Sequence, residues 1–238
     1  GLQSTVGRAL TPADLKALAR DVQPRLVAAL AAEKAGARAD VGENVLVLRM
    51  AAAMVGRWVR DELEEWQEGT NVTIIGLEEQ MARKFDLEDG KSIAFRGIAD
   101  RVEVHRSPRG EVWQVIDYKT GQVEGKDLKL GANWKDKLGD GQHGKALQLL
   151  LYAAMLRASH PEAHAIRSAI RAGRKGAGDA SSLLTLKWEG NSVLDPSHDD
   201  LLKDWLGEVV TSLLPRDDSA AVTHNDDSRW CADCLTLE

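Results

Sequence analysis

Two aspartates and a lysine near the middle of the chain are of the types that bind a divalent cation and act on a phosphate: Asp100, Asp117 and Lys119. Asp117 and Lys119 stand two apart in a run rich in β-branched and aromatic residues, which is typical of a strand. Because alternate residues of a strand share a face, these two side chains project together, whereas Ile116 and Tyr118 point the other way. The sequence therefore predicts an acid and a lysine held side by side.

A turn places the second aspartate near the first. Ser107-Pro108-Arg109-Gly110 is turn chemistry between two β-like runs, 93–104 and 111–118, which indicates a β-hairpin. If the turn is symmetric, Asp100 lies opposite or nearly opposite Asp117, where paired Cβ atoms are about 4.5–5.5 Å apart. Two carboxylates that close repel each other unless a cation or a proton lies between them.

Mg²⁺ prefers carboxylate, carbonyl and water oxygens, so it suits this pair of acids. A water activated by the metal, with Lys119 placed to orient it or to stabilise charge on the phosphate, suits hydrolysis of a phosphodiester. A salt-bridged surface hairpin is the alternative that the Asp-x-Lys motif alone leaves open.

The elements that must position these residues follow from periodicity. Thr11 before Pro12 predicts a helix N-cap, and apolar residues recur at helical spacing through Leu30 and again over about 44–66. Further elements are expected as strands at 72–75, 93–104, 111–118, 165–170 and 183–188, and as helices at 145–158 and 199–214. The Gly- and Lys-rich stretch 121–144 is expected to be a long exposed loop that faces substrate or moves.

This order predicts one α/β domain, with a central mixed β-sheet flanked by helices. Within it, 1–70 is expected to be an N-terminal helical segment packed on a core of 71–190, and 191–238 supplies a last helix and a CxxC tail. With 238 residues the chain can bury a full core. Neither a bilayer-crossing apolar run nor a signal-peptide pattern is visible, so we expect a cytoplasmic protein with no membrane partner.

The charge bears on DNA binding. A net charge of -6 argues against a protein that coats DNA non-specifically, because phosphate neutralisation needs surplus Lys and Arg. It does not exclude a DNA enzyme, since acids gathered at a metal site lower the total. Arg167, Arg171, Arg174 and Lys175 form a local basic stretch that either lines a DNA groove or is a solvated face.

Three motifs in order carry a family resemblance. The sequence resembles the RecB/AddB nuclease domain of the PD-(D/E)XK superfamily over about 74–156. The motifs that carry this resemblance are, in order, GIADRVEV, VIDYKTG after the turn, and Gln148-Leu-Leu-Leu-Tyr152. The resemblance implies a restriction-endonuclease-like core. It also implies that Asp100, Asp117 and the carbonyl of Tyr118 bind the metal and that Lys119 is the catalytic lysine.

The resemblance adds side chains from two other elements. Gln148 and Tyr152 are four apart on a helix, so they share a face and can both reach the site or the DNA. The family also places a glutamate on the preceding strand, where Glu78 fits best and Glu79 is the neighbouring alternative. Strand alternation allows only one of these two to face the metal.

The chain departs from the family in two places. The segment 50–66 lacks the histidine that some RecB-like nucleases carry there. AddB-type domains often hold an iron-sulfur cluster through four cysteines, but here only Cys231 and Cys234 are present. A cluster is therefore expected only if flanking cysteines exist outside this chain.

The resemblance implies a DNA nuclease of exonuclease type that uses Mg²⁺ or Mn²⁺. It further implies a role in double-strand-break repair and recombination, with an AddA-like helicase-nuclease subunit as partner. Two alternatives are a catalytically inactive nuclease-fold module for DNA binding or subunit docking, and a CRISPR adaptation nuclease. A phosphate-binding loop is disfavoured, because GxxxxGK at Gly139–Lys145 is followed by Ala146 in place of a hydroxyl.

Overall fold

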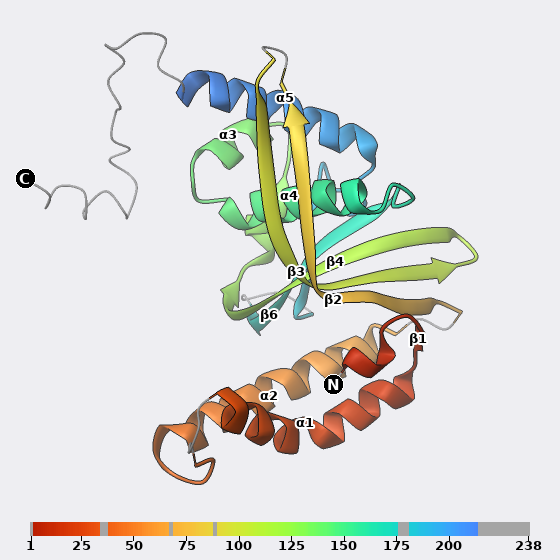
Figure 1. Ribbon diagram of the computed structural model, residues 1–238, viewed down its shortest axis with the longest axis vertical. Helices are drawn as coiled ribbons and strands as arrows, with labels where there is room; N and C mark the ends of the chain where they lie inside the picture. Colours follow the sequence, from red (N-terminus) through yellow and green to blue (C-terminus); the bar gives the residue numbers. More distant parts are fainter. Residues whose placement is uncertain (1, 34–37, 67–68, 88–89, 176–180, 214–238) are drawn as a thin grey trace, which may run out of the picture.

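The computed structural model describes residues 2–33, 38–66, 69–87, 90–175 and 181–213. Its centre is a six-stranded mixed sheet in the order β1-β2-β3-β4-β6-β7, drawn in Figure 1. The strands are β1 (Ala9–Leu10), β2 (Asn71–Asp86), β3 (Ser92–Ser107), β4 (Gly110–Val123), β6 (Ile166–Lys175) and β7 (Leu183–Thr185). All neighbours in the sheet are antiparallel except β4 and β6, which run parallel. The predicted mixed α/β architecture is confirmed.

The predicted hairpin joins β3 to β4. Its register runs from Ser107↔Gly110 to Arg101↔Ile116, so the turn is symmetric about residues 108 and 109. Continuing this register would bring Asp100 opposite Asp117. Turn chemistry and period-two patterning were therefore sufficient to predict this part of the sheet.

Strand β2 is much longer than the 72–75 that the sequence suggested. It has 16 residues and contains a β-bulge between Ile74 and Gly76. Figure 1 shows β2 and β3 bending into an arm that rises beside α5. In the register of these two strands, the pairs Leu77↔Arg101 and Glu79↔Ala99 stand on either side of Glu78. Glu78 has a φ of 53°, a conformation that few residues other than glycine adopt.

Helices cover both faces of the sheet (Figure 1). On one face, α3 (Trp134–Gly139), α4 (Gly144–Ser159) and α5 (Pro196–Leu213) enclose the main core. On the other, α1 (Pro12–Glu33) and α2 (Gly42–Glu64) enclose a smaller cluster that includes Leu15, Val59 and Ile74. We call these two sides the α4 face and the α2 face.

The first helix begins where its capping signal predicts. The N–H of Asp14 donates to Thr11 Oγ1 at 3.2 Å, and Asp14 Oδ2 accepts a hydrogen bond from the N–H of Thr11 at 2.9 Å. This reciprocal pair satisfies two backbone donors at the helix start.

The expectation of a long exposed loop over 121–144 was wrong. The segment contains the end of β4, a 3-10 helix η2 (Gly125–Leu128), the short strand β5 (Lys129–Leu130) and α3. β5 pairs with β8 (Lys187–Trp188) in a second, two-stranded sheet. Leu128, Leu130, Trp134 and Leu138 are buried. The spacing of these apolar residues, two and then four, matches a short extended segment followed by a helix. Their burial therefore determines the structure of this segment, although its Gly and Lys content is typical of a loop.

None of the helices in the described part of the chain is both long enough and apolar enough to span a bilayer.

Candidate active site

Asp117 and Lys119 meet on the α4 face of β4. Lys119 Nζ lies 2.8 Å from Asp117 Oδ2 and donates to Oδ1 at 3.1 Å. The Asp117 side chain is 6% exposed and that of Lys119 is 35% exposed. The Asp117 carboxylate is thus largely buried, while the Lys119 ammonium stays partly exposed to solvent.

Asp100 reaches the same place from β3. Its Oδ2 accepts a hydrogen bond from the backbone N–H of Tyr118, at 2.6 Å. Since Tyr118 lies between Asp117 and Lys119 in the chain, this bond brings the second acid to the same short stretch of β4. The sequence predicted this proximity, and the structure brings the three residues together.

Helix α4 adds two side chains. Gln148 Nε2 donates to Asp117 Oδ1 at 3.3 Å and to the Tyr152 hydroxyl at 3.0 Å. That hydroxyl donates in turn to the carbonyl of Ile98, at 2.8 Å. The helical spacing of four residues therefore places Gln148 and Tyr152 in one chain of hydrogen bonds that joins β4, α4 and β3.

Tyr152 remains a donor at neutral pH. Burial raises the pKa of its phenol, the hydrogen bond from Gln148 opposes this, and the negative charge of Asp117 raises the pKa further. A neutral phenol can keep its bond to the Ile98 carbonyl, which a phenolate could not.

A glycine allows α4 to approach β3 this closely. A Cβ on Gly97 would lie 3.0 Å from both Tyr152 Cε1 and Met155 Cε. These distances are short enough that the two side chains would have to move. Gly97 therefore belongs with the residues that set the position of Tyr152.

On the α2 face, Tyr118 points away from the acids, as strand alternation predicted. Its ring packs against Trp58 of α2, with ring centroids 5.0 Å apart. Only the backbone of Tyr118 is therefore available on the acidic side.

The glutamates of β2 do not complete a cluster with the aspartates. Glu78 is exposed, and the carboxylate of Glu79 occupies the space where a Cβ on Gly76 would stand. Among the described residues, no three His, Cys, Asp or Glu side chains converge closely enough to hold a metal ion. A role for Glu78 or Glu79 stays a prediction, and Cys231 and Cys234 lie outside the described residues.

The two aspartates still fit a hard divalent cation. Asp117 Oδ2 is buried and, apart from its ion contact with Lys119, accepts no hydrogen bond. Mg²⁺ is usually held by one or two carboxylates and keeps several waters, so it does not need a third acid. Two acids together with water ligands satisfy that requirement.

The basic stretch of β6 lies mostly elsewhere. Arg171 is 2% exposed and pairs at 3.1 Å with Glu65, the residue that follows α2, while Arg167 donates to Gln114 at 3.1 Å. Residues four apart on a strand share a face, so Arg167 lies on the same side of β6 as Arg171. That side is the α2 face, because Arg171 contacts Glu65 at the end of α2. They do not line the site around Asp117, and Arg174 is exposed.

Sequence reasoning missed a buried polar network on the α2 face. Arg101 is 1% exposed and pairs with Glu62 of α2 at 2.7 Å and with Glu103. Gln114 donates to Glu103 at 2.9 Å. The available signal was the alternation of polar and apolar residues in Arg101-Val102-Glu103-Val104-His105. A strand whose polar face is exposed to solvent shows the same alternation.

This network borders a cavity of about 270 Å³ between the end of α2 and the sheet, whose charged lining residues are Glu62, Glu65, Glu103, Arg167 and Arg171. Their charges are largely matched within the protein, through Arg101 with Glu62 and Glu103 and through Arg171 with Glu65.

A mixed sheet flanked by helices, with an acid on one strand and Asp-x-Lys on the next, is a restriction-endonuclease-like fold. The family model of the PD-(D/E)XK nuclease superfamily matches residues 2–237, so the chain belongs to that superfamily. Its members are typically nucleases and generally use divalent metals such as Mg²⁺. None of the curated proteins matches the chain.

Proposed function

We propose that the chain is a deoxyribonuclease that depends on Mg²⁺ or Mn²⁺ and hydrolyses phosphodiester bonds. The observation that carries this proposal is the meeting of Asp117 and Lys119 with Asp100 and Gln148 from two other elements. A surface salt bridge between Asp117 and Lys119 would need neither a second acid nor a hydrogen bond from a helix side chain such as Gln148. Three polar side chains from three elements, gathered around the nearly buried carboxylate of Asp117, are better explained by chemistry than by stability.

Asp100, Asp117 and the carbonyl of Tyr118 would hold the metal. When bound, the metal would lower the pKa of a water and offset charge on the phosphate. The ammonium of Lys119, about a third of whose side chain is exposed, can contact the phosphate and stabilise the charge that grows there during attack. Gln148 fixes the orientation of the Asp117 carboxylate, and Tyr152 fixes Gln148.

We further infer exonuclease-type degradation in double-strand-break repair and recombination, in the cytoplasm and together with an AddA-like helicase-nuclease subunit. The proposal is supported by the order and the residue identities of the three motifs over 74–156, which resemble the RecB/AddB domain. The competing proposal, an inactive module for DNA binding or docking, is disfavoured because Asp100, Asp117 and Lys119 are all in place.

Cleavage of linear single-stranded and double-stranded DNA in Mg²⁺, Mn²⁺ or EDTA tests the proposal. We expect metal-dependent degradation that falls by about 100-fold or more in Lys119→Ala and Asp117→Asn. Lys84→Ala is the matched control, because Lys84 also pairs with an aspartate two residues away, Asp86 at 3.1 Å, but on the exposed surface.

The control should cleave like the wild type. If the wild-type protein binds DNA without cutting it, and neither site substitution changes binding, the inactive module replaces the nuclease.

A further inference from the structure

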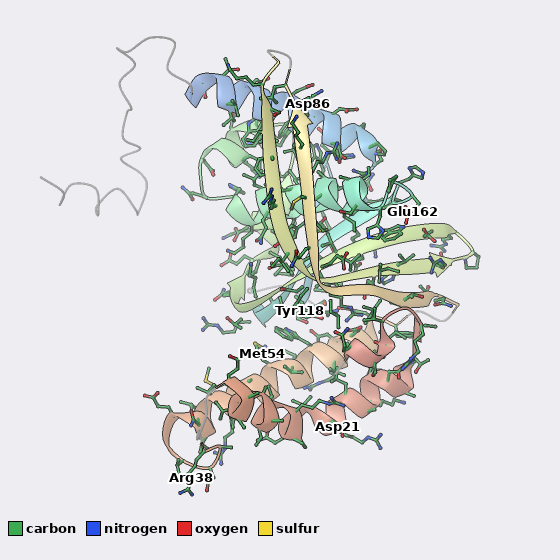
Figure 2. The ribbon with its side chains drawn as sticks, viewed as in Figure 1. Asp21, Arg38, Met54, Asp86, Tyr118 and Glu162 are labelled. Atoms are coloured by element: carbon green, nitrogen blue, oxygen red, sulfur yellow. The ribbon has the colours of Figure 1, made fainter. Side chains whose placement is uncertain are left out.

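Helix α2 covers the back of the catalytic strand. The ring of Trp58 packs on Tyr118 at an interplanar angle of 40° and a centroid distance of 5.0 Å. Figure 2 shows Tyr118 and Met54 at this boundary between the sheet and α2. Tyr118 lies between Asp117 and Lys119, so the contact reaches the site from the side opposite its acids.

The same tryptophan also binds the neighbouring strand. Trp58 Nε1 donates to the carbonyl of Ala172 at 2.8 Å. In the parallel ladder, Ala172 is the register partner of Lys119, and Arg171 is the partner of Tyr118. One side chain therefore contacts both strands at the level of the proposed catalytic residues.

The contact falls where β4 has lost its regular pairing with β3. Pairing of β3 with β4 ends at Arg101↔Ile116, and the register of β4 with β6 shifts between Lys119 and Gln122. Residues 117–119 thus lie beyond the regular β3 ladder and pair regularly with β6 alone, and the β6 ladder becomes irregular directly after them. A segment with fewer ladder bonds needs other contacts to hold its backbone in one position.

There is little free space behind this segment. A Cβ on Gly173 would lie 2.7 Å from Met54 Sδ and against the carbonyl oxygen of Thr120. Met54 and Trp58 are one helical turn apart, so they share a face of α2. Together they fill the space behind the irregular part of β4.

We propose that Trp58 is a positioning residue that fixes the backbone of Tyr118, and through it the spacing of Asp100, Asp117 and Lys119. The inference rests on the proposed function of that site. Its physical basis is that the Tyr118 N–H binds Asp100 while the Tyr118 ring is held by Trp58. Residues that orient metal-binding groups from behind typically contribute about 10- to 100-fold to metal affinity or activity.

Two substitutions separate positioning from simple packing. Trp58→Phe keeps an aromatic ring over Tyr118 and removes the N–H bond to Ala172, whereas Trp58→Leu removes both contacts. Trp113→Phe is the matched control: it removes an indole N–H bond to Glu111, 2.9 Å long, from a buried tryptophan at the other end of β4.

Three measurements are made on each variant: Mn²⁺ affinity without DNA, hydrogen exchange of the Tyr118 amide, and kcat and KM for DNA cleavage. We expect Trp58→Phe to weaken Mn²⁺ binding and lower kcat about tenfold, with faster Tyr118 exchange and little change in KM. Trp58→Leu should be worse in each respect. Trp113→Phe should lower the melting temperature without changing these values.

The proposal is overturned if Mn²⁺ affinity and Tyr118 exchange stay at wild-type values in both Trp58 variants, or change equally in Trp113→Phe. A wild-type protein that cuts no DNA would contradict the proposed function alone. Amide exchange would still decide whether Trp58 holds Tyr118.

Discussion

Asp100 accepts a hydrogen bond from the backbone N–H of Tyr118, at 2.6 Å, just past the last regular pair between β3 and β4. The bond replaces a ladder contact with one made by an acidic side chain. Asp100 therefore has two separable roles: it holds the backbone of β4 and supplies a negative charge beside Asp117.

Asp100→Asn separates these roles, because the amide oxygen can still accept the N–H bond while the charge is lost. We expect it to lower Mn²⁺ affinity and DNA cleavage by about 100-fold while leaving urea stability in EDTA nearly unchanged. Asp100→Ala should lose cleavage as well, and also about 1 kcal/mol of unfolding free energy. Cleavage retained by Asp100→Asn would remove Asp100 from the metal site.

Lys119→Met should expose how much Asp117 depends on a cation. The carboxylate would lose its ion pair while it stays buried, so unfolding in EDTA should become easier by about 1 kcal/mol, a modest value because Lys119 is partly exposed. Added Mn²⁺ should then raise the melting temperature more than in the wild type. Lys84→Met serves as the control, and an equal response to Mn²⁺ in both variants would contradict the proposed metal site.

The sequence predicted the parts of the site that depend on short-range rules. Turn chemistry at Pro108-Arg109 set the β3–β4 register, and period-two alternation put Asp117 and Lys119 on one face with Tyr118 on the other. The spacing of four residues on a helix likewise put Gln148 and Tyr152 on one face. Each rule needs only residues that are neighbours in one element or across one turn.

Other features depended on distant contacts. The choice between Glu78 and Glu79 assumed regular alternation, but the bulge after Ile74 and the positive φ at Glu78 break it. Gly76 is a local sign of the bulge, since a glycine inside a strand often marks one, but the positive φ falls on a glutamate and has no such sign. Arg101 pairs with Glu62, 39 residues away, so its burial depends on where α2 packs. Tertiary packing determined these positions, and single-sequence patterns do not contain it.

Glu103→Gln should make stability less dependent on pH. Burial alone would raise the pKa of Glu103, but the charge of Arg101, helped by His105, lowers it from 4.5 to about 2. A lowered folded-state pKa contributes stability that is full above pH 4.5 and is lost as the pH falls through about 2. The free energy of unfolding of the wild type, measured in urea, should fall as the pH falls through this window. In the variant this free energy should fall less steeply.

At neutral pH the same variant leaves Arg101 with Glu62 alone, so we expect a loss of about 3 kcal/mol. Glu111→Gln, which breaks an exposed pair with Arg106 of 2.8 Å and keeps an oxygen that can accept the Trp113 indole N–H, should change little at any pH. A Glu103→Gln protein as acid-sensitive as the wild type would show that other carboxylates control the acid transition.

Gly97→Ala should damage the site without touching an acid. The added methyl group would press on Tyr152 and Met155, so Tyr152 would shift from the Ile98 carbonyl and Gln148 would lose its support. We expect a stability loss of about 1–3 kcal/mol from overpacking and a fall in kcat of about tenfold. Gly56→Ala is the control, since nothing lies within 4 Å of its Cβ position and alanine favours a helix interior.

To separate site geometry from stability, kcat is compared at a temperature where both variants are fully folded. Tyr152→Phe, which removes only the hydroxyl, should reproduce the fall in kcat with a smaller stability loss. If Gly97→Ala lowers stability but leaves kcat at the wild-type value, the contact of α4 with β3 is structural, and the chain of bonds from Ile98 through Tyr152 and Gln148 does not set the position of Asp117.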